Sequence, residues 1–400
     1  MTAMAQRDTA GFSDLLAEAE KISELARELA VDTERERRLV PALVDRLRDS
    51  GLMRAGALRT LGAAQAPPGI ALECAETIAR GDAATGWCVS IAITSSLLAG
   101  YLPEEGAAEA LGDPRAIAAG VWAPRGTARP VDGGLLVSGR WAFCSGITHS
   151  EYFFGGCVLV TGEEAEGAGA SEATGDQIQP VLRAVGIPTS QMEILDTWHT
   201  SGLRATGSHD AVADDVFIPT HRTLSLLDGP LVDAPLYRFP LFGYFALSIA
   251  AAALGNARGA IDDLLDLAGR KVALGARRTL AEKPMTQAAV GQAEAALRAA
   301  RAFYYQAIDE AWQAAESGEP VSVELRTGLR LAATHAVRTS AEVARSMYDL
   351  GGGSSIYETS PLQRRFRDAN TATAHMQVNP AMWETTGRVL LDLPTNTSQL

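Results

Sequence analysis

One segment of the sequence combines strand-forming aromatic residues with groups that can do chemistry. It reads RWAFCSGITHSEYF, residues 140–153, and its centre is a thiol, a hydroxyl and a glycine: Cys144, Ser145 and Gly146. A segment that only filled a sheet would not need this interruption. The serine hydroxyl can hydrogen-bond to a bound group, or it can satisfy nearby backbone atoms. Because a glycine lets the backbone approach a ligand closely, the segment is a candidate site.

Common catalytic motifs are absent from the rest of the sequence. There is no phosphate-binding loop of the G-x-x-x-x-G-K-[ST] kind, no G-x-G-x-x-G between a strand and a helix, no G-x-S-x-G and no H-E-x-x-H. The six histidines are never spaced four apart, so no metal site is predicted. The four cysteines form no C-x-x-C pair, which predicts free thiols in a reducing compartment.

Charge and composition narrow the class of protein further. The net charge of −13 disfavours nucleic acid as a partner, because phosphate binding needs a basic surface. The first residues lack the basic start and apolar run of a signal peptide, so we expect a cytoplasmic protein. The longest apolar stretch, residues 88–102, is shorter than the roughly 18 residues that span a bilayer. It predicts a helix buried in protein, and no membrane association.

The hydrophobic period changes twice along the chain, which predicts three domains of an α+β protein. Residues 11–112 repeat apolar side chains at helical spacing and predict an N-terminal helical domain. Residues 113–225 are short β-branched and aromatic runs between turn formers, and they predict a central antiparallel β domain of roughly six to eight strands. Within it, the acidic segment 161–177 predicts a surface loop. Residues 235–390 predict a C-terminal four-helix bundle.

The predicted helix over residues 245–268 is apolar around nearly its whole circumference. A bundle helix normally turns one face to water, so this pattern predicts a face that meets another subunit. Symmetric association is the usual outcome. We therefore expect a homo-oligomer, a tetramer, with a dimer as the alternative.

The order of helices, β domain and helical bundle resembles the acyl-CoA dehydrogenase fold, in which a flavin lies between the β domain and the bundle. Five blocks resemble family segments in the same order: GDAATGW at 81–87, GVWAP at 120–124, VDGGLLVSGRWAFCSGITH at 131–149, DTWHTSGLRATGSHDAVADDVFIPTHR at 196–222 and GGGSSIYETSPLQRRFRDA at 351–369. Each block alone is a weak signal. Together they identify the chain as similar to this superfamily over most of its length.

The resemblance implies a flavin site built from these blocks. Trp87 would border the flavin ring, or it is simply a core residue. Ser145 would aim its hydroxyl at the N5–C4a edge of the ring. Arg278 resembles an arginine that reaches the flavin phosphates of a neighbouring subunit, or it belongs to a solvated basic turn. The implied cofactor-binding residues are Trp87, Gly120, Val121, Trp122, Phe143, Cys144, Ser145, Arg278, Gly353, Ser354, His375 and Met376.

Chemistry separates two classes within the superfamily. A dehydrogenase needs a carboxylate base. At the position where the common short- and medium-chain dehydrogenases carry this base, the present sequence has Met376, which cannot act as a base. His375 matches a histidine near the flavin of two-component flavin-dependent monooxygenases, which include the 4-hydroxyphenylacetate and secosteroid phenol hydroxylases. The resemblance implies two catalytic residues. Ser145 would stabilise a C4a-hydroperoxyflavin, and His375 would supply a proton, since its unperturbed pKa is about 6.5.

The substrate site departs from the pattern of the phenol hydroxylases. These hydroxylases have an activating histidine eight residues after the flavin-wall tryptophan, and this sequence has Ser95 at that position. Some members also have a serine on the first flavin-bracketing strand, where this sequence has Gly120. Thr148 or His149 are alternative activating groups. The departure favours an electron-rich ring that needs less activation, such as an indole or a polycyclic aromatic, or an amine or sulfur centre. The expected substrate residues are Ser95, Tyr237, Phe239 and Phe242. The alternative for the three aromatic residues is ordinary interface packing.

The sequence therefore predicts the oxygenase component of a two-component flavin monooxygenase. It would use O2 and reduced FAD or FMN, supplied by a transiently bound NAD(P)H-dependent flavin reductase, to hydroxylate an aromatic or heteroaromatic small molecule. One alternative is a dehydrogenase or desaturase with tightly bound FAD. Another is a structural or binding protein that uses the same scaffold without a flavin.

Overall fold

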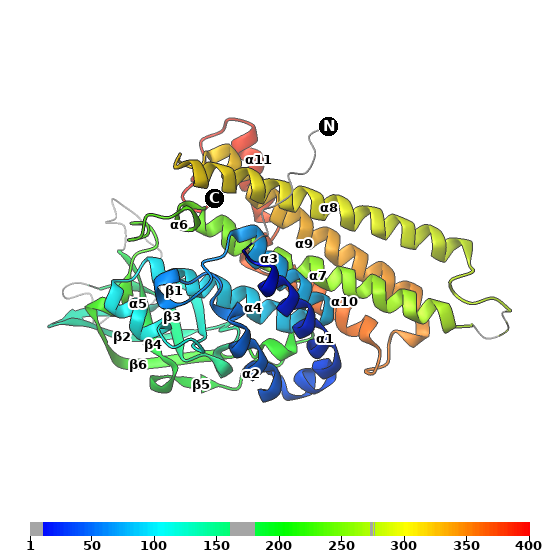
Figure 1. Cartoon of the computed structure of the whole chain (residues 1–400), viewed down its shortest axis with the longest axis horizontal. Helices are drawn as coiled ribbons and strands as arrows, with labels where there is room; N and C mark the ends of the chain where they lie inside the picture. Colours follow the sequence, from blue (N-terminus) through cyan, green and yellow to red (C-terminus); the bar gives the residue numbers. More distant parts are fainter. Residues whose placement is uncertain (1–10, 161–180, 273–274, 276) are drawn as a thin grey trace, which may run out of the picture.

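The computed structural model describes residues 11–160, 181–272, 275 and 277–400. A β-sheet occupies one end of the molecule and long helices extend away from it, with the N-terminal helices between them (Figure 1). The segment 161–177, predicted as a surface loop, lies outside the described residues. The secondary structure changes from helix to strand after Leu111 and back to helix at Pro235. The domain boundaries themselves stay a prediction.

The N-terminal helices begin and end where local chemistry requires it. Helix α2 ends at Gly51, whose φ of 71° is the left-handed conformation that glycine adopts without strain. Asp82 caps α4 by accepting a hydrogen bond of 2.9 Å from the Thr85 amide. The helices of this part are α1 (Ser13–Glu36), α2 (Pro41–Ser50), α3 (Pro68–Gly81), α4 (Ala83–Ser96) and α5 (Glu104–Leu111).

The sheet has seven strands in the order β5-β6-β2-β1-β3-β4-β7. Five of the six pairings are antiparallel, as expected, but β1 and β3 are parallel. The difference arises because the chain leaves β2, crosses over through residues 142–151, and returns on the other side of β1. The candidate segment is this crossover. The strands are β1 (Ala118–Val131), β2 (Gly134–Trp141), β3 (Tyr152–Leu159), β4 (Leu182–Pro188), β5 (Glu193–Leu195), β6 (Asp210–Pro219) and β7 (Thr223–Leu224).

In the described C-terminal part, three long helices and a shorter fourth one form the expected four-helix bundle. The fourth, α10, covers the stretch that was expected to supply the last helix, but it ends at Ala372, before a short 3-10 turn at Met376–Val378. The helices are α6 (Pro235–Arg238), α7 (Leu241–Arg270), α8 (Pro284–Ser317), α9 (Val323–Gly351), α10 (Pro361–Ala372) and α11 (Ala381–Leu390).

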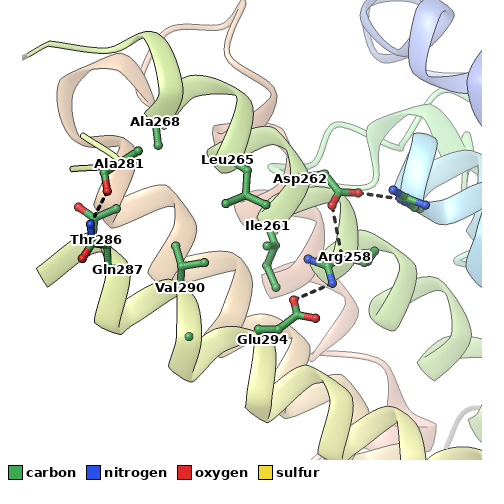
Figure 2. Close-up of a pocket in the computed structure, with 12 residues that line it drawn as sticks. Arg258, Ile261, Asp262, Leu265, Ala268, Ala281, Thr286, Gln287, Val290 and Glu294 are labelled. Atoms are coloured by element: carbon green, nitrogen blue, oxygen red, sulfur yellow. Dashed lines mark hydrogen bonds and ion pairs between the residues drawn. The ribbon is translucent and has the colours of Figure 1, made fainter. Parts of the chain in front are cut away.

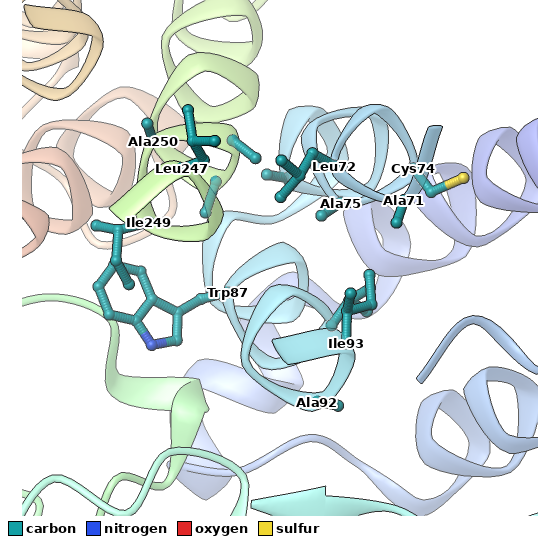
Figure 3. Packing of buried hydrophobic residues seen from close by; sticks show 14 of the residues in the cluster. Ala71, Leu72, Cys74, Ala75, Trp87, Ala92, Ile93, Leu247, Ile249 and Ala250 are labelled. Atoms are coloured by element: carbon teal, nitrogen blue, oxygen red, sulfur yellow. The ribbon is translucent and has the colours of Figure 1, made fainter. Parts of the chain in front are cut away.

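Helix α7 is covered by its own chain. It packs against α3 and α4 on the N-terminal side and against α9 and α10 in the bundle. Figure 3 shows Leu72 and Ala75 of α3 facing Leu247 and Ala250 of α7. The helices nearly touch, because a side chain added at Gly255 would place its Cβ 2.0 Å from the Glu76 carbonyl oxygen. Most of α7 is therefore buried within its own chain, while near its end the apolar side chain of Leu265 stays 50% exposed. The contact of α7 with another subunit stays a prediction.

Helix α4 lies at the centre of the molecule and contacts both β1 and α7. Among the described residues, the stretch Ala83–Gly100 is long and apolar enough to cross a membrane by length and composition alone, and 94% of it is buried inside the protein. The apolar stretch at 88–102 therefore packs in the core, as predicted. Trp87 of α4 lies beside Ile249 of α7, with its indole nitrogen turned away from this core (Figure 3).

Candidate active site

The candidate segment is anchored by the backbone of a second segment. The Cys144 amide donates to the His209 carbonyl at 3.2 Å, and the Gly146 amide donates to the Thr206 carbonyl at 2.9 Å. Gly146 has a φ of 79°, a conformation that favours glycine. Phe143 also has a positive φ, 65°, and its side chain is 70% exposed. An exposed aromatic ring on a strained residue is characteristic of a functional surface.

Ser145 belongs to a chain of hydrogen bonds that has only one possible direction. Trp87 Nε1 can only donate, and it lies 3.1 Å from Ser145 Oγ. Ser145 Oγ lies 2.7 Å from Ser208 Oγ, which lies 2.6 Å from Thr206 Oγ1. Thr206 must donate to the Leu203 carbonyl, 2.8 Å away, because a carbonyl oxygen only accepts. Every hydroxyl proton therefore points toward Leu203, and Ser145 Oγ keeps one lone pair for a ligand.

His375 joins this chain through Trp87. The two rings meet edge to face with centroids 5.6 Å apart. His375 Nδ1 accepts a hydrogen bond of 3.3 Å from the Gln377 amide, so Nε2 carries the proton. Burial, and secondly the Arg330 guanidinium, lowers the pKa of His375 to about 4. His375 is therefore a neutral donor near pH 7 in the protein alone, and not the readily protonated group that the ordinary pKa had suggested.

A row of aromatic rings connects the sheet to α7. Trp122 of β1 stacks on Phe245 with centroids 5.4 Å apart and an interplanar angle of 7°, and it also stacks on Phe154. Phe242 meets Phe245 edge to face. A Cβ at Gly120 would lie 2.6 Å from the Trp122 ring, so glycine is required for this ring position. Phe242, Phe245 and Ile249 share one face of α7 by helical spacing, which places the row next to Trp87.

The predicted substrate residues separate into two groups. Tyr237 and Phe239 are 4% and 3% exposed, and the Tyr237 hydroxyl donates to the Gly56 carbonyl at 3.2 Å. They pack in the core of the chain, which supports the packing alternative over a substrate wall. Phe242 is partly exposed and belongs to the aromatic row. Ser95 is 1% exposed, and its hydroxyl has no hydrogen-bond partner.

Of the alternative activating groups, His149 is partly buried and its Nδ1 has no partner. Burial, and secondly Arg48, lowers the pKa of His149 to about 4. A Cβ at Gly207 would lie 3.3 Å from Thr148 Oγ1, so this hydroxyl is close to the 206–209 segment. Neither residue has a carboxylate that would make it a stronger base.

The residues predicted at the flavin phosphates lie at the other end of the bundle from the sheet. Arg278 is exposed in the α7–α8 connection, and Gly353 and Ser354 follow α9 (Figure 1). Lys271 links the two segments, because its ammonium donates to the Gly351 carbonyl. The fold thus brings these residues together, but within one chain it separates them from Ser145. That they serve a flavin site on a neighbouring subunit, as was expected of Arg278, stays a prediction. Val121 is partly buried in β1 beside Trp122, and Met376 is 58% exposed beside His375.

A groove of about 730 Å³ opens between α7 and α8 (Figure 2). Its apolar side chains include Ile261, Leu265 and Val290. The charged groups beside them are paired, as in the 2.7 Å contact between Arg258 and Glu294. None of the residues around Ser145 lines this groove, so it does not belong to the candidate active site.

Sequence reasoning did not single out several residues that the fold brings to the site. Ser208 and Thr206 were inside the quoted block GLRATGS, but only the structure shows their hydroxyls in line with Ser145. Phe245 was only part of an aromatic-rich segment. The signal for Arg330 was a single arginine within the apolar helix pattern LRLAATHAV, which a sequence alone cannot distinguish from a surface position.

Comparison with known proteins identifies the chemistry of this arrangement. Residues 247–380 match the family described as acyl-CoA dehydrogenase, C-terminal domain. The chain is 35% identical over 355 residues to the indole-3-acetate monooxygenase of Pseudomonas putida, covering 88% of this chain and 87% of that protein. It is 28% identical over 387 residues to the oxygenase component of an FADH2-dependent resorcinol hydroxylase from Rhizobium sp., covering 92% and 91%. The chain belongs to the flavin-dependent monooxygenases with the acyl-CoA dehydrogenase fold.

The monooxygenase superposes on XiaF from Streptomyces sp., solved in complex with FADH2 and glycerol, with a TM-score of 0.86. That likeness covers 96% of both chains at 26% identity. The predicted fold, the oxidoreductase class and the use of reduced flavin are thereby confirmed. The two-component class implies a reductase that supplies the flavin.

The side chains at the candidate site fit a reduced flavin. The N5–H of the reduced ring is a donor, and the free lone pair of Ser145 is an acceptor for it. Met376 offers exposed apolar surface next to His375, whose ring meets Trp87, and Phe143 offers an exposed ring two residues before Ser145, which suits a flat ring system. No carboxylate stands at the position of Met376, so the base that a dehydrogenase needs is missing there.

Proposed function

We propose that this monooxygenase hydroxylates an electron-rich aromatic ring, and that the ring is a heteroaromatic one of the indole type. The aromatic row of Trp122, Phe245 and Phe242 carries this proposal, because its partly exposed member Phe242 offers an aromatic ring to a flat substrate on the α7 face next to Trp87. Ser95 stands where a phenol hydroxylase would have its activating histidine. A substrate ring that needs no deprotonation agrees both with the aromatic row and with the serine at position 95.

Reduced FAD or FMN, when bound, supplies the electrons with which O2 is split into the oxygen that enters the ring and the oxygen that leaves as water. The chain's own residues bind and orient the reactants. Ser145 would hold the reduced ring at N5–H, while Trp87 fixes the serine. Neutral His375 would offer its Nε2 proton, and the buried rings around it exclude water, which limits loss of oxygen as hydrogen peroxide.

The assembly and location of the enzyme are also proposals. The α7–α8 connection, which carries Arg278, lies at the far end of the bundle from the sheet (Figure 1), and this agrees with a flavin site completed by a neighbouring subunit in a homotetramer. An NAD(P)H-dependent reductase would deliver the reduced flavin by transient contact. All four cysteines are free and buried, which agrees with a reducing cytoplasm.

One experiment tests the proposed function. The purified protein is mixed under argon with reduced flavin and indole or a substituted indole, and O2 is then added. We expect a hydroxylated product, little bound flavin in the protein as purified, and no reaction with oxidised flavin alone. A yellow protein that reduces its own flavin on addition of an acyl thioester would instead show a dehydrogenase.

A second measurement tests the site. Ser145→Ala is expected to release more hydrogen peroxide per product, because the hydrogen bond at N5 is lost. Peroxide yield equal to that of the wild type would show that Ser145 does not contact the flavin.

A further inference from the structure

Asp368, in α10, is a carboxylate enclosed in the protein without an ion pair. The residue is 3% exposed. Among the described residues no arginine or lysine forms an ion pair with it, whereas Asp263, whose side chain is 8% exposed, is paired with Arg365 at 3.0 Å. The Asp368 carboxylate instead accepts a hydrogen bond of 2.6 Å from the Leu203 amide. Because a buried charge is costly unless it is compensated, a carboxylate in this place needs an explanation beyond packing.

The amide that Asp368 holds belongs to a residue in a strained conformation. Leu203 has a φ of 49° and a ψ of 34°, the left-handed region that residues other than glycine rarely adopt. The backbone next to it is pressed against α10, because a Cβ added at Gly202 would lie 2.2 Å from the Arg367 carbonyl oxygen. The hydrogen bond to Asp368 therefore helps to hold a backbone conformation that the leucine by itself would leave.

The carbonyl of the same residue ends the hydrogen-bond chain of the active site. The Leu203 oxygen accepts from Thr206 Oγ1 at 2.8 Å and from Trp198 Nε1 at 2.9 Å. Thr206 in turn directs the hydroxyls of Ser208 and Ser145, which follow at 2.6 and 2.7 Å. If the Leu203 backbone relaxed, its carbonyl would rotate away from Thr206. The hydroxyl protons would then lose their common direction.

We propose that Asp368 is a positioning residue of the monooxygenase: by holding the Leu203 amide from the bundle, it keeps the Ser145 hydroxyl turned so that it accepts a hydrogen bond from reduced flavin. This inference rests on the proposed function for the contact between Ser145 and the flavin, and it adds the group that fixes this contact from the bundle side. Asp368 acts through Leu203, Thr206 and Ser208, and not on the reacting atoms.

The charge of Asp368 changes close to neutral pH. Burial, and secondly the Asp82 carboxylate, raises its pKa to about 7. The hydrogen bond that it accepts and the guanidinium groups of Arg364 and Arg367 act in the opposite direction. Glu34 of α1 pairs with both of these arginines. A neutral carboxyl group is a weaker acceptor than a carboxylate, so the hold on the Leu203 amide weakens as the pH falls through this pKa.

The test measures the ratio of the affinities for reduced and oxidised flavin, by titration of the full-length protein with FAD and FMN under argon. Asp368→Ala removes the acceptor and should lower this ratio by about 2–10-fold, the equivalent of a modest hydrogen bond. Asp368→Asn keeps a neutral oxygen in the same place. Its ratio should lie between those of the wild type and Asp368→Ala, so the conservative variant rescues part of the effect.

The pH dependence of the ratio separates positioning from packing. In the wild type the ratio should fall between pH 8 and pH 6 as Asp368 takes up its proton, and in Asp368→Asn this part of the change should be absent. The titration of the flavin itself is common to both proteins and cancels in the comparison. His375, whose pKa is about 4, stays neutral over this range.

The matched control is Asp263→Asn. Asp263 also holds α10, through Arg365, and its other partner is Arg27 of α1. Its substitution is expected to lower the stability in urea and to leave the flavin ratio unchanged. If Asp368→Ala does not fold, the comparison of the wild type with Asp368→Asn across the pH range gives the answer instead.

Two results would overturn the proposal: an unchanged ratio in a folded Asp368→Ala protein, or the same pH dependence in the wild type and Asp368→Asn. If Ser145→Ala also leaves the ratio unchanged, the contact between Ser145 and the flavin is refuted together with the role of Asp368. The titrations contain no aromatic substrate. Failure to hydroxylate an indole would therefore refute the proposed substrate and leave the role of Asp368 standing.

Discussion

At the scale of single residues, the direction of the hydrogen-bond chain is the feature with the clearest consequence. The Ser145 hydroxyl donates its proton to Ser208, so it can only accept a hydrogen bond from a ligand. Reduced flavin presents N5–H, a donor, whereas oxidised flavin presents only an acceptor at N5. We therefore expect this hydrogen-bond chain to favour the reduced form of the flavin, which suits an enzyme that receives its flavin from a reductase.

We predict that Ser208→Ala weakens this preference. The substitution frees the Ser145 proton to serve oxidised flavin, so the ratio of affinities for reduced and oxidised flavin should fall by about 5–30-fold, corresponding to one hydrogen bond. The ratio is measured by titration of both forms under argon. Ser150→Ala is the control, because Ser150 is a buried serine whose hydroxyl donates to the Gly146 carbonyl. If the affinity ratio is unchanged in Ser208→Ala but changed in Ser145→Ala, Ser145 contacts the flavin and Ser208 does not set the direction of its hydroxyl.

Two partly buried histidines with lowered pKa values should make the enzyme sensitive to acid. The folded pKa values of His149 and His375 are about 4, below the ordinary 6.5. Between these values the unfolded chain binds the proton and the folded chain does not, so stability falls as the pH drops from 6.5 toward 4. The loss is about 1.4 kcal/mol per pH unit for each histidine.

Urea unfolding at pH 7 and pH 5 measures this effect. His149→Gln is expected to lose about 2 kcal/mol less than wild type between the two pH values, since it removes one of the two linked groups. Equal losses in the variant and the wild type would mean that His149 is protonated in the folded protein at pH 5.

At the scale of elements, the close packing of α3 on α7 is decisive for the fold. Gly255→Ala forces the helices apart, because the new Cβ would lie 2.0 Å from a backbone oxygen. We expect a loss of about 1–3 kcal/mol in the free energy of unfolding. Gly269→Ala, in the same helix, is the control. No atom lies within 4 Å of its added Cβ, so it should gain about 0.5–1 kcal/mol. Chemical denaturation checks both, and a neutral Gly255→Ala would contradict the packing.

At the scale of the whole molecule, exposed apolar side chains gather on the segments around the far end of the bundle. They include Leu265, Val272, Met285, Ile356 and Tyr357, which are 50–77% exposed. Surfaces of this kind usually meet a partner. They are a reason to expect a tetramer of about four times 42.1 kDa.

Light scattering measures the mass, and Leu265→Asp is expected to lower it. Phe217→Asp, at a similarly exposed position on the sheet, should leave it unchanged. If the flavin site is shared, Arg278→Ala weakens flavin binding while the chain stays folded. A wild-type monomer that hydroxylates its substrate would refute both the assembly and the shared site.

The sequence by itself determined the class of the protein and predicted the residues of a candidate site. Hydrophobic periods depend on local chain geometry, so they located the helical and strand regions. Ser145, Trp87 and His375 were predicted together because motif blocks keep their order along the chain. Tertiary structure alone decided the parallel pairing of β1 with β3, the burial of α7 under α3, and the orientation of the Ser145 hydroxyl. It also decided that Asp368 of α10 lies against the Leu203 amide. These features depend on which distant segments meet, and a linear pattern does not carry that information.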